Sequence, residues 1–283
     1  MKRPDLVVLG GTAVVTGAAG GMGEHLAKGV ARRGADVVVI DRDEAGLARV
    51  VADIRRETPS ASVTSHVVDL ADRGAADAVI ARVREERPGV TMLFNNAGVA
   101  LGGRFDEVGA DDFDWLLEIN LLVPIRLTRA LLPLMLANGQ GQVVNTSSLF
   151  GLVGPPGQSA YSTSKYGLRG FSEALRSELE EEGRPVGVTV VHPGGIRTNI
   201  ATNARVAAGT DPQEAARGKA DFAKVLRYPA DQAAEEIIDA AVARRPRLLI
   251  GNDAKGLDLL ARVTPSRYWS LMGRAMALAA KRS

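Results

Sequence analysis

The chain has 283 residues, 46% of them apolar, which is enough to bury one substantial core in a single domain with extensions, 1–283. It contains no cysteine, so disulfides, thiol nucleophiles and thiolate metal sites are excluded, and the composition fits a cytoplasmic protein. The net charge is +2, but residues 244–283 hold nine Lys or Arg against two Asp or Glu, so the body of the chain is mildly acidic. A body without a basic stripe argues against nucleic acid as a partner.

The N-terminal run MKRPDLVVLGGTAVVTG places basic residues before apolar ones and has no cleavage site. It predicts a first strand, of which Thr12 to Thr16 form the buried part. No stretch of the chain reaches about 18 uninterrupted apolar residues, so a transmembrane helix is not indicated.

A glycine-rich turn, TGAAGGMG, follows this strand and leads into the helical run EHLAKGVARRG. Its glycines are Gly17, Gly21 and Gly23, with Met22 between the last two. Glycines let the backbone approach a pyrophosphate, and the helix N-terminus stabilises its charge. The spacing G-x-x-x-G-x-G is wider than the common dinucleotide motif, and such a turn can also serve tight packing alone.

The next strand, Ala35 to Asp41, ends in a carboxylate. A carboxylate accepts hydrogen bonds from ribose hydroxyls and repels a 2′-phosphate, so Asp41 favours NAD over NADP. Arg42 could pair with a 2′-phosphate, which leaves NADP open. Asp41 could instead cap the following helix.

Two further strands with polar ends come next in the chain. The run SVTSHVVDL ends at Asp69 and Leu70, and Asp69 could equally cap the helix that follows. The run VTMLFNNAG predicts the central strand and a turn in which Asn96 bonds backbone groups and Gly98 lets the chain bend.

A long apolar helix, DDFDWLLEINLLVPIRLTRALLPLMLANG, carries Asn120 near its middle. Taken alone, this amide is expected to satisfy a neighbouring backbone group. Pro124 lies one turn later and predicts a kink.

The stretch from Asn145 to Gly170 concentrates the residues suited to proton transfer. Ser148 ends an apolar strand, a Gly/Pro-rich loop follows, and Tyr161 and Lys165 stand four apart in a long helix. Side chains four apart share one helix face, where an ammonium lowers the pKa of a phenol toward neutral pH. Ser148 could then hold a substrate oxygen while Tyr161 transfers the proton. By itself, Y-x-x-x-K is common in helices with no such role.

The last third of the chain begins with the strand and glycine turn PVGVTVVHPGGIRT. His192 precedes a proline at a strand end and is interpreted as structural, and the other histidines, His25 and His66, are too scattered for a metal site. The Ala- and Gly-rich segment 199–227 predicts a helical substrate lid. A helix, a final strand and a basic C-terminal extension, 252–283, follow. The extension is expected to pack over the substrate mouth or a neighbouring subunit, although a peripheral membrane contact is possible.

Alternating strands and helices with glycine turns predict a doubly wound, Rossmann-type α/β fold, a three-layer α/β/α sandwich with a parallel sheet of about seven strands. In order and spacing, TGAAGGMG, Asp41, NNAG, Asn120, the Ser148 to Lys165 stretch and HPGGIRT resemble the short-chain dehydrogenase/reductase family over nearly the whole chain.

This resemblance implies residue roles. The catalytic set would be Asn120, Ser148, Tyr161 and Lys165, with Asn120 holding a water that links Lys165 to solvent. Asp69 and Leu70 would lie beside adenine, and the HPGGIRT turn beside nicotinamide. The implied cofactor contacts are Gly17, Gly21, Met22, Gly23, Asp41, Arg42, Asp69, Leu70, Asn96, Ala97, Gly98, Tyr161, Lys165, Pro193, Gly194, Ile196 and Thr198.

The predicted function is an NAD(H)-dependent oxidoreductase that interconverts a secondary alcohol and a ketone without a metal. Apolar residues expected at the pocket wall favour a bulky apolar substrate such as a steroid, terpene or lipid; these are Leu149, Leu152, Val153, Pro155 and Phe222. The alternatives are an NADP(H)-dependent carbonyl reductase and a non-catalytic nucleotide-binding regulator or scaffold. The resemblance also implies a homotetramer or homodimer.

Overall fold

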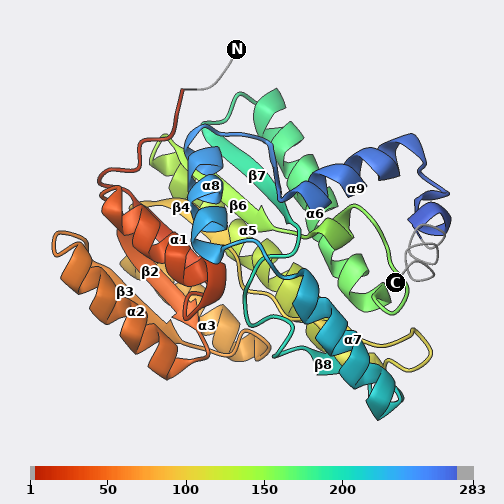
Figure 1. Ribbon diagram of the computed structural model, residues 1–283. Coiled ribbons are helices and arrows are strands. Elements are labelled where there is room, and N and C mark those ends of the chain that lie inside the picture. Colours follow the sequence, from red (N-terminus) through yellow and green to blue (C-terminus); the bar gives the residue numbers. More distant parts are fainter. Residues whose placement is uncertain (1–3, 273–283) are drawn as a thin grey trace.

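A computed structural model describes residues 4–272 and contains one seven-stranded parallel sheet (Figure 1). The strand order is β3-β2-β1-β4-β6-β7-β9, which confirms the predicted doubly wound architecture. The strands are β1 (Thr12–Thr16), β2 (Asp36–Asp41), β3 (Val63–Val67), β4 (Val90–Asn95), β6 (Gly141–Thr146), β7 (Val186–Pro193) and β9 (Arg247–Ile250).

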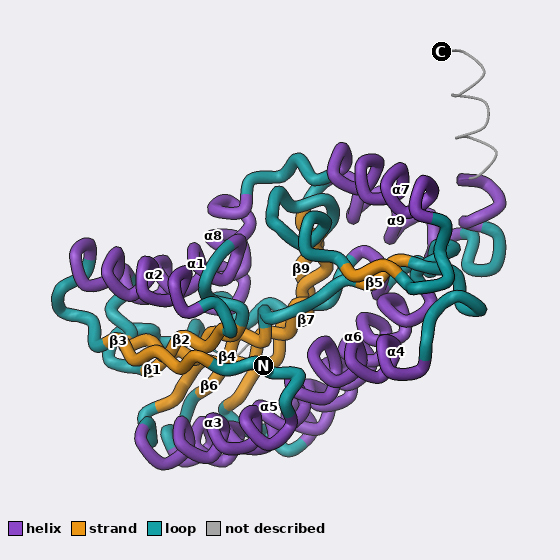
Figure 2. Tube along the Cα trace, turned by 90° about the horizontal axis from the view of Figure 1, so that it is seen from below, coloured by secondary structure: helices purple, strands orange, loops and turns teal. Residues whose placement is uncertain are grey.

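Helices cover both faces of the sheet and make the three layers (Figure 2). One face is covered by α1 (Gly21–Arg32), α2 (Glu44–Glu57) and α8 (Ala230–Val242), and the other by α3 (Arg73–Glu86), α5 (Val123–Ala137) and α6 (Ser159–Glu181). Strand residues alternate between the two cores, so Val15 packs with the first set of helices and Val14 with the second. Strands buried on both faces need continuous apolar runs, as TAVVT shows.

The sheet reverses its direction of growth between β1 and β4, which lie side by side. Ligands of open α/β sheets bind at such a switch point, beyond the carboxyl ends of the strands. The turns that follow Thr16 and Asn95 meet there. The first strand begins only at Thr12, although Leu6 and Val8 are also buried.

Helix caps resolve two alternatives that the sequence leaves open. Asp43, not Asp41, caps α2 by accepting from the amide of Gly46 at 3.0 Å. Asp72, not Asp69, caps α3 through the amide of Ala75. Asp41 and Asp69 are therefore not needed to cap these helices.

The helical stretch Ala110–Ala137 is not one regular helix. It consists of α4 (Ala110–Leu117), a π-helical turn (Glu118–Leu122) and α5. Pro124 has no amide hydrogen to continue the regular pattern, so the expected kink takes the form of a π-helical turn. By length and composition the stretch could span a membrane, but Leu127, Leu131 and Met135 belong to the buried core.

The remaining elements lie toward one end of the sandwich (Figure 2). Short strands β5 (Leu101–Gly102) and β8 (Arg205–Val206) pair with each other, and α7 (Pro212–Val225) follows within the predicted lid. The C-terminal extension begins with α9 (Asn252–Val263), and its predicted part 273–283 lies outside the described residues.

Candidate active site

A cleft of about 810 Å³ lies at the carboxyl ends of the strands, on the switch-point edge. Ligand pockets typically have volumes of roughly 300–1,000 Å³, so this cleft has the size for a large ligand. It runs from Asp41 to Tyr161. The predicted cofactor residues that line it are Gly17, Gly21, Met22, Asp41, Arg42, Asp69, Leu70, Asn96, Ala97, Gly98, Tyr161, Lys165, Pro193, Gly194, Ile196 and Thr198.

Gly23 does not line the cleft, contrary to its predicted role. A Cβ atom on Gly23 would collide with the carbonyl oxygen of Gly17, so this glycine lets α1 pack directly on the loop. Gly17 has a φ of +65°, and a Cβ there would lie 2.8 Å from the Cα of Ala97. The close approach of the two switch-point turns therefore requires Gly17.

The N-terminus of α1 suits a pyrophosphate. In the described part of the chain no side chain caps this helix, whose N-cap is Gly20. Gly20 and Gly21 line the cleft, and nothing lies within 4 Å of a Cβ built on Gly20. First-turn amides and the positive end of the helix dipole are thus available to a negative group. The loop fits the phosphates of a dinucleotide.

Asp41 closes the far end of the cleft with a carboxylate held by backbone. One oxygen accepts from the amide of Ala19 at 3.0 Å and the other from that of Asp43 at 3.1 Å. Beside it lies Arg49, which sequence reasoning missed. Its guanidinium pairs with Glu24 at 2.8 Å and donates to the carbonyl of Ala19 at 2.9 Å.

Tyr161 and Ser148 meet at the other end of the cleft, where their side chains are hydrogen-bonded. Burial raises the pKa of the Tyr161 phenol above its usual value, and the hydrogen bond with Ser148 opposes this shift. The Ser148 hydroxyl also accepts from the amide of Phe150 at 3.1 Å. The two hydroxyls are thus paired in the wall of the cleft, with Tyr161 buried and Ser148 partly exposed.

The prediction that Lys165 lowers the pKa of Tyr161 is not met in this structure. Its ammonium donates to the carbonyl of Thr146 at 3.0 Å and lies 5.6 Å from the centroid of the Tyr161 ring. Burial lowers the pKa of Lys165 to about 8, since desolvation disfavours the charged amine. With the amine held by a carbonyl, burial dominates the pKa of the phenol.

Asn120 lies in the π-helical turn and is fully buried. Its amide nitrogen donates to the carbonyl of Val99 at 2.9 Å, and its oxygen accepts from the amide of Val99 at 2.9 Å. This is the backbone-satisfying role that the residue alone suggested. The oxygen of Asn120 and the amine of Lys165 also lie near Gly98, each 3.4 Å from a Cβ built there. The predicted relay partners are therefore neighbours.

His192 supports Ser148 from behind. Its Nδ1 lies 3.0 Å from the carbonyl oxygen of Ser148, which can only accept, so this nitrogen carries the proton. Burial lowers the pKa of His192 to about 4, which keeps the ring neutral. The structural interpretation of His192 is confirmed.

The part of the cleft beyond Tyr161, which we call the substrate half, is mostly apolar. Of the predicted wall residues, Leu149 and Phe222 line it, but Leu152, Val153 and Pro155 do not. Leu152 and Val153 are instead buried in the protein. Further apolar lining comes from residues that sequence reasoning missed, namely Val99, Trp115, Ile119, Phe150, Ile200, Val225, Leu226 and Leu257.

Asp253, at the start of α9, is a further missed residue that lines the cleft. Its carboxylate accepts from the amide of Gly195 at 2.7 Å and from that of Ala254 at 2.9 Å. A Cβ on Gly194 would collide with this carboxylate. The C-terminal extension thereby fixes the turn after β7. Nothing in the local sequence marks an aspartate so far along the chain as a partner of that turn.

Comparisons with known proteins agree with this fold and site. The family model described as short chain dehydrogenase matches residues 11–208. The oxidoreductase SadH of Mycobacterium tuberculosis is 39% identical over 272 residues, which cover 95% of this chain and 96% of SadH. Dehydrogenase/reductase SDR family member 7B of Mus musculus is 32% identical over 92% of this chain and 79% of its own length.

Solved structures show the same architecture. A short-chain dehydrogenase/reductase from Burkholderia phymatum in complex with NAD has a TM-score of 0.82 and 28% identity, covering 92% of this chain and 95% of that one. A short-chain dehydrogenase from Sphingobium yanoikuyae in complex with NADPH has a TM-score of 0.74 and 27% identity, covering 95% of each chain. The chain belongs to the short-chain dehydrogenase/reductase family. It is an oxidoreductase with an NAD(P)-binding Rossmann fold that acts on CH–OH donors.

Proposed function

We propose that this enzyme interconverts a secondary alcohol and a ketone with Tyr161 as the proton acceptor and donor. The observation that carries the proposal is the hydrogen-bonded pair of Tyr161, which is buried, and Ser148, which is partly exposed, in the wall of the cleft. Ser148 holds the substrate oxygen, and Tyr161 removes or returns its proton. Lys165 and Asn120, which both lie near Gly98, would form the path by which the proton leaves the phenol.

We further propose that the cofactor is NAD(H). When bound, it supplies the hydride acceptor or donor and, in its oxidised form, a positively charged ring. The uncapped α1 N-terminus would hold the pyrophosphate, and Asp41 the adenosine ribose. The turn after β7, fixed by Asp253, would hold the nicotinamide end.

Asp41 supports NAD, since a carboxylate repels a 2′-phosphate. Arg42 and Arg49 line the same end of the cleft and keep NADP(H) as the alternative. We expect Asp41→Ala to raise the preference for NADP(H) by about tenfold or more, because removing the carboxylate leaves two cations there. Titrating wild type and variant with both cofactors checks this. Tighter binding of NADP(H) than of NAD(H) by the wild-type enzyme would contradict the assignment.

We propose a bulky, largely apolar alcohol or ketone as the substrate, of the size of a steroid, terpene or lipid chain. The support is the apolar lining of the substrate half, including Phe150, Phe222 and Leu257. Burial of such a substrate against aromatic and aliphatic walls is favourable at roughly 25 cal/mol per Å².

The proposed reaction is tested by screening a panel of alcohols and ketones with both cofactors, following the absorbance of the reduced nicotinamide. We expect Tyr161→Phe to lower kcat by about 10²- to 10⁴-fold while cofactor binding is retained, because only the transferable proton is removed. The matched control is Tyr166→Phe on the same helix, since Tyr166 does not line the cleft.

Two outcomes would contradict the proposal. Unchanged alcohol oxidation by Tyr161→Phe would remove Tyr161 from the chemistry. Tight cofactor binding by the wild type without turnover of any alcohol or ketone would favour a nucleotide-binding regulator or scaffold instead.

A further inference from the structure

Among the described residues, Arg205 is the arginine that lines the mostly apolar substrate half, where Asn199 and Asn203 also lie. Arg205 lines the cleft and is held at its wall by the pairing of β8 with β5. Its amide donates to the carbonyl of Ala100 at 3.0 Å, and the amide of Ala207 donates to the carbonyl of Gly102 at 2.8 Å. The backbone of Arg205 is therefore fixed on both sides of the side chain.

The guanidinium of Arg205 is oriented by two partners from α4. It lies over the ring of Trp115, 3.6 Å from the centroid, and its Nη1 pairs with the carboxylate of Asp112 at 3.0 Å. Stacking on the ring occupies the flat face of the group and leaves its N–H edges free. Within residues 4–272, Nε and Nη2 of Arg205 have no hydrogen-bond or ion-pair partner.

The other charged groups of the cleft are committed elsewhere. Arg42 and Arg49 line the cleft at the Asp41 end, and Lys165 is buried against the carbonyl of Thr146. The carboxylate of Asp253 is engaged by the amides of Gly195 and Ala254. Arg205 is thus the cation available to a molecule bound in the substrate half.

We propose that Arg205 recognises a carboxylate carried by the substrate at a distance from its alcohol or ketone carbon. The substrate class is then a hydroxy or oxo acid with an apolar body, which deepens the proposed function and rests on it. A guanidinium with a free edge binds a carboxylate by charge-assisted hydrogen bonds. Because the Arg205 side chain is 49% exposed, little desolvation opposes the exchange of water for a carboxylate.

The alternative role for Arg205 is purely structural. Its contacts with Trp115 and Asp112 also join the segment that bears β8 to α4. The two roles predict different effects for the loss of Arg205. If Arg205 binds substrate, its loss weakens the binding of acids more than that of esters, whereas the loss of a purely structural contact affects acids and esters alike.

The experiment uses matched pairs of oxo acids and their methyl esters, graded in chain length, with the full-length enzyme. Arg205→Met and Asp112→Asn are compared with wild type by steady-state kinetics. Binding of each acid and ester to the enzyme–cofactor complex is measured in parallel by calorimetry, so a readout remains even without turnover. Arg104→Met is the matched control, since Arg104 is exposed beside β5 and does not line the cleft.

We expect Arg205→Met to weaken the binding of the acids by about tenfold or more, and to change the binding of the esters by less than about twofold. Asp112→Asn should keep the preference for acids over esters, since its partner atom Nη1 is not part of the free edge, and Arg104→Met should leave the binding of both unchanged. Equal effects of Arg205→Met on acids and esters would overturn the proposal. A wild type that turns over neutral alcohols but prefers each ester to its acid would overturn this inference alone. Absence of turnover with every compound would count against the proposed function instead.

Discussion

The acidity of Tyr161 is the residue-scale question on which the proposed chemistry depends. The protein alone raises the pKa of this phenol by burial, and the hydrogen bond with Ser148 offsets only part of the shift. The Lys165 ammonium is directed to the carbonyl of Thr146 rather than to the phenol oxygen. A positive charge brought into the cleft would favour the phenolate, so the phenol is expected to become acidic only in the loaded enzyme.

Asp253 offers a test of how the nicotinamide end of the cleft is held. Both of its carboxylate oxygens accept from amides, and Asp253→Asn replaces one acceptor by a donor, which leaves an amide without a partner. We expect NAD(H) to bind about five- to tenfold more weakly, with ADP-ribose binding unchanged, because ADP-ribose lacks the nicotinamide. Calorimetric titration of both ligands measures the difference.

The control for this variant is Asp258→Asn on the same helix. Asp258 forms a bidentate ion pair with Arg247 and does not line the cleft. It should lower thermal stability without changing the ratio of the two affinities. If Asp253→Asn lowers the affinity for ADP-ribose as much as the affinity for NAD(H), Asp253 supports the fold in general rather than the nicotinamide end of the cleft.

The residues predicted correctly for the cleft are those whose placement is decided locally. Tyr161 and Lys165 share a helix face, and Asp41 ends a strand beside the glycine turn, so short-range geometry brings each to the cleft. Arg205 and Asp253 reach it only through pairing of β8 with β5 and docking of α9. Such long-range contacts have no local sequence signal, and they were missed for this reason.

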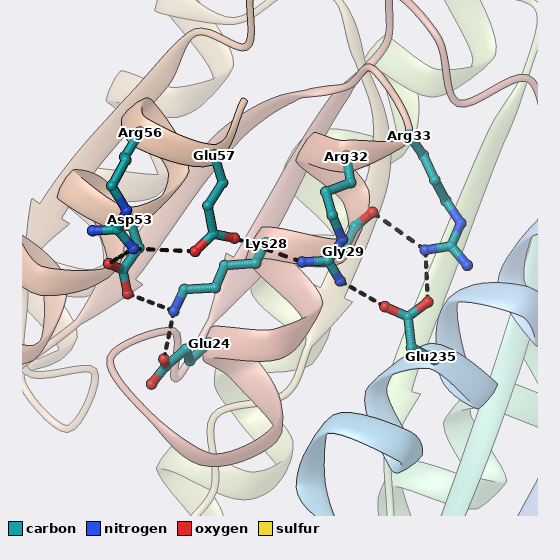
Figure 3. Close-up of polar contacts among 9 residues, drawn as sticks. All are labelled: Glu24, Lys28, Gly29, Arg32, Arg33, Asp53, Arg56, Glu57 and Glu235. Atoms are coloured by element: carbon teal, nitrogen blue, oxygen red, sulfur yellow. Dashed lines mark hydrogen bonds and ion pairs between the residues drawn. The ribbon is translucent and has the colours of Figure 1, made fainter. Parts of the chain in front are cut away.

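At the scale of elements, an ion-pair network ties α1 to both neighbouring helices (Figure 3). Lys28 of α1 pairs with Glu24 at 2.7 Å and with Asp53 of α2 at 2.6 Å. On the other side, Arg32 and Arg33 pair with Glu235 of α8 at 2.8 and 2.9 Å. The helix whose N-terminus faces the cleft is therefore anchored against displacement on two sides.

Glu24 makes this network sensitive to acid. The hydrogen bond from Arg49, together with that from Lys28, lowers the pKa of Glu24 from 4.5 to about 2, although burial opposes the shift. A carboxylate with a lowered folded-state pKa stabilises the fold above its unfolded value and loses that contribution as pH falls toward 2. We expect Glu24→Gln to be less stable than wild type near neutral pH, with the difference shrinking as pH falls from 4.5 toward 2.

Thermal unfolding midpoints across this pH range measure the difference. Glu57→Gln is the control, since Glu57 has about 40% of its side chain exposed and joins only the edge of the network. Its effect should be small at every pH. If the unfolding midpoints of Glu24→Gln and wild type differ by the same amount down to pH 2, the ionised carboxylate of Glu24 is not the source of the stability.

Element boundaries were predicted where a local signal exists and missed where packing decides. The strand at β1 and the helix at α6 follow from their apolar patterns. The π-helical turn at Glu118–Leu122 was expected only as a kink, because proline indicates an interruption but not which hydrogen-bonding pattern replaces the regular one.

At the scale of the whole molecule, the family model ends at residue 208, yet the cleft does not. Phe222, Leu257 and Asp253 line it from the part of the chain that follows. That part carries no residue of the proposed proton-transfer set. Substrate choice is therefore expected to depend on this region more than on the glycine loop.

We propose that the enzyme works as a homodimer or homotetramer assembled through its long helices. Leu122 is a large apolar side chain left 43% exposed at the π-helical turn, which fits a face that another subunit covers. Light scattering over a range of concentrations should give a multiple of the 29.8 kDa chain mass. A mass of one chain throughout that range would refute the assembly.

The pairing of β5 with β8 bears on how a large molecule enters the cleft. Residue 207 is tied to Gly102, and at the far end of the segment the amides of Arg227 and Tyr228 both donate to the carbonyl of Gly195. None of the described residues of α7, which lies between these two ties, is buried. The segment is thus fastened at both ends and exposed along α7, so we expect it to move more readily than the wall that carries Tyr161 when a bulky substrate enters.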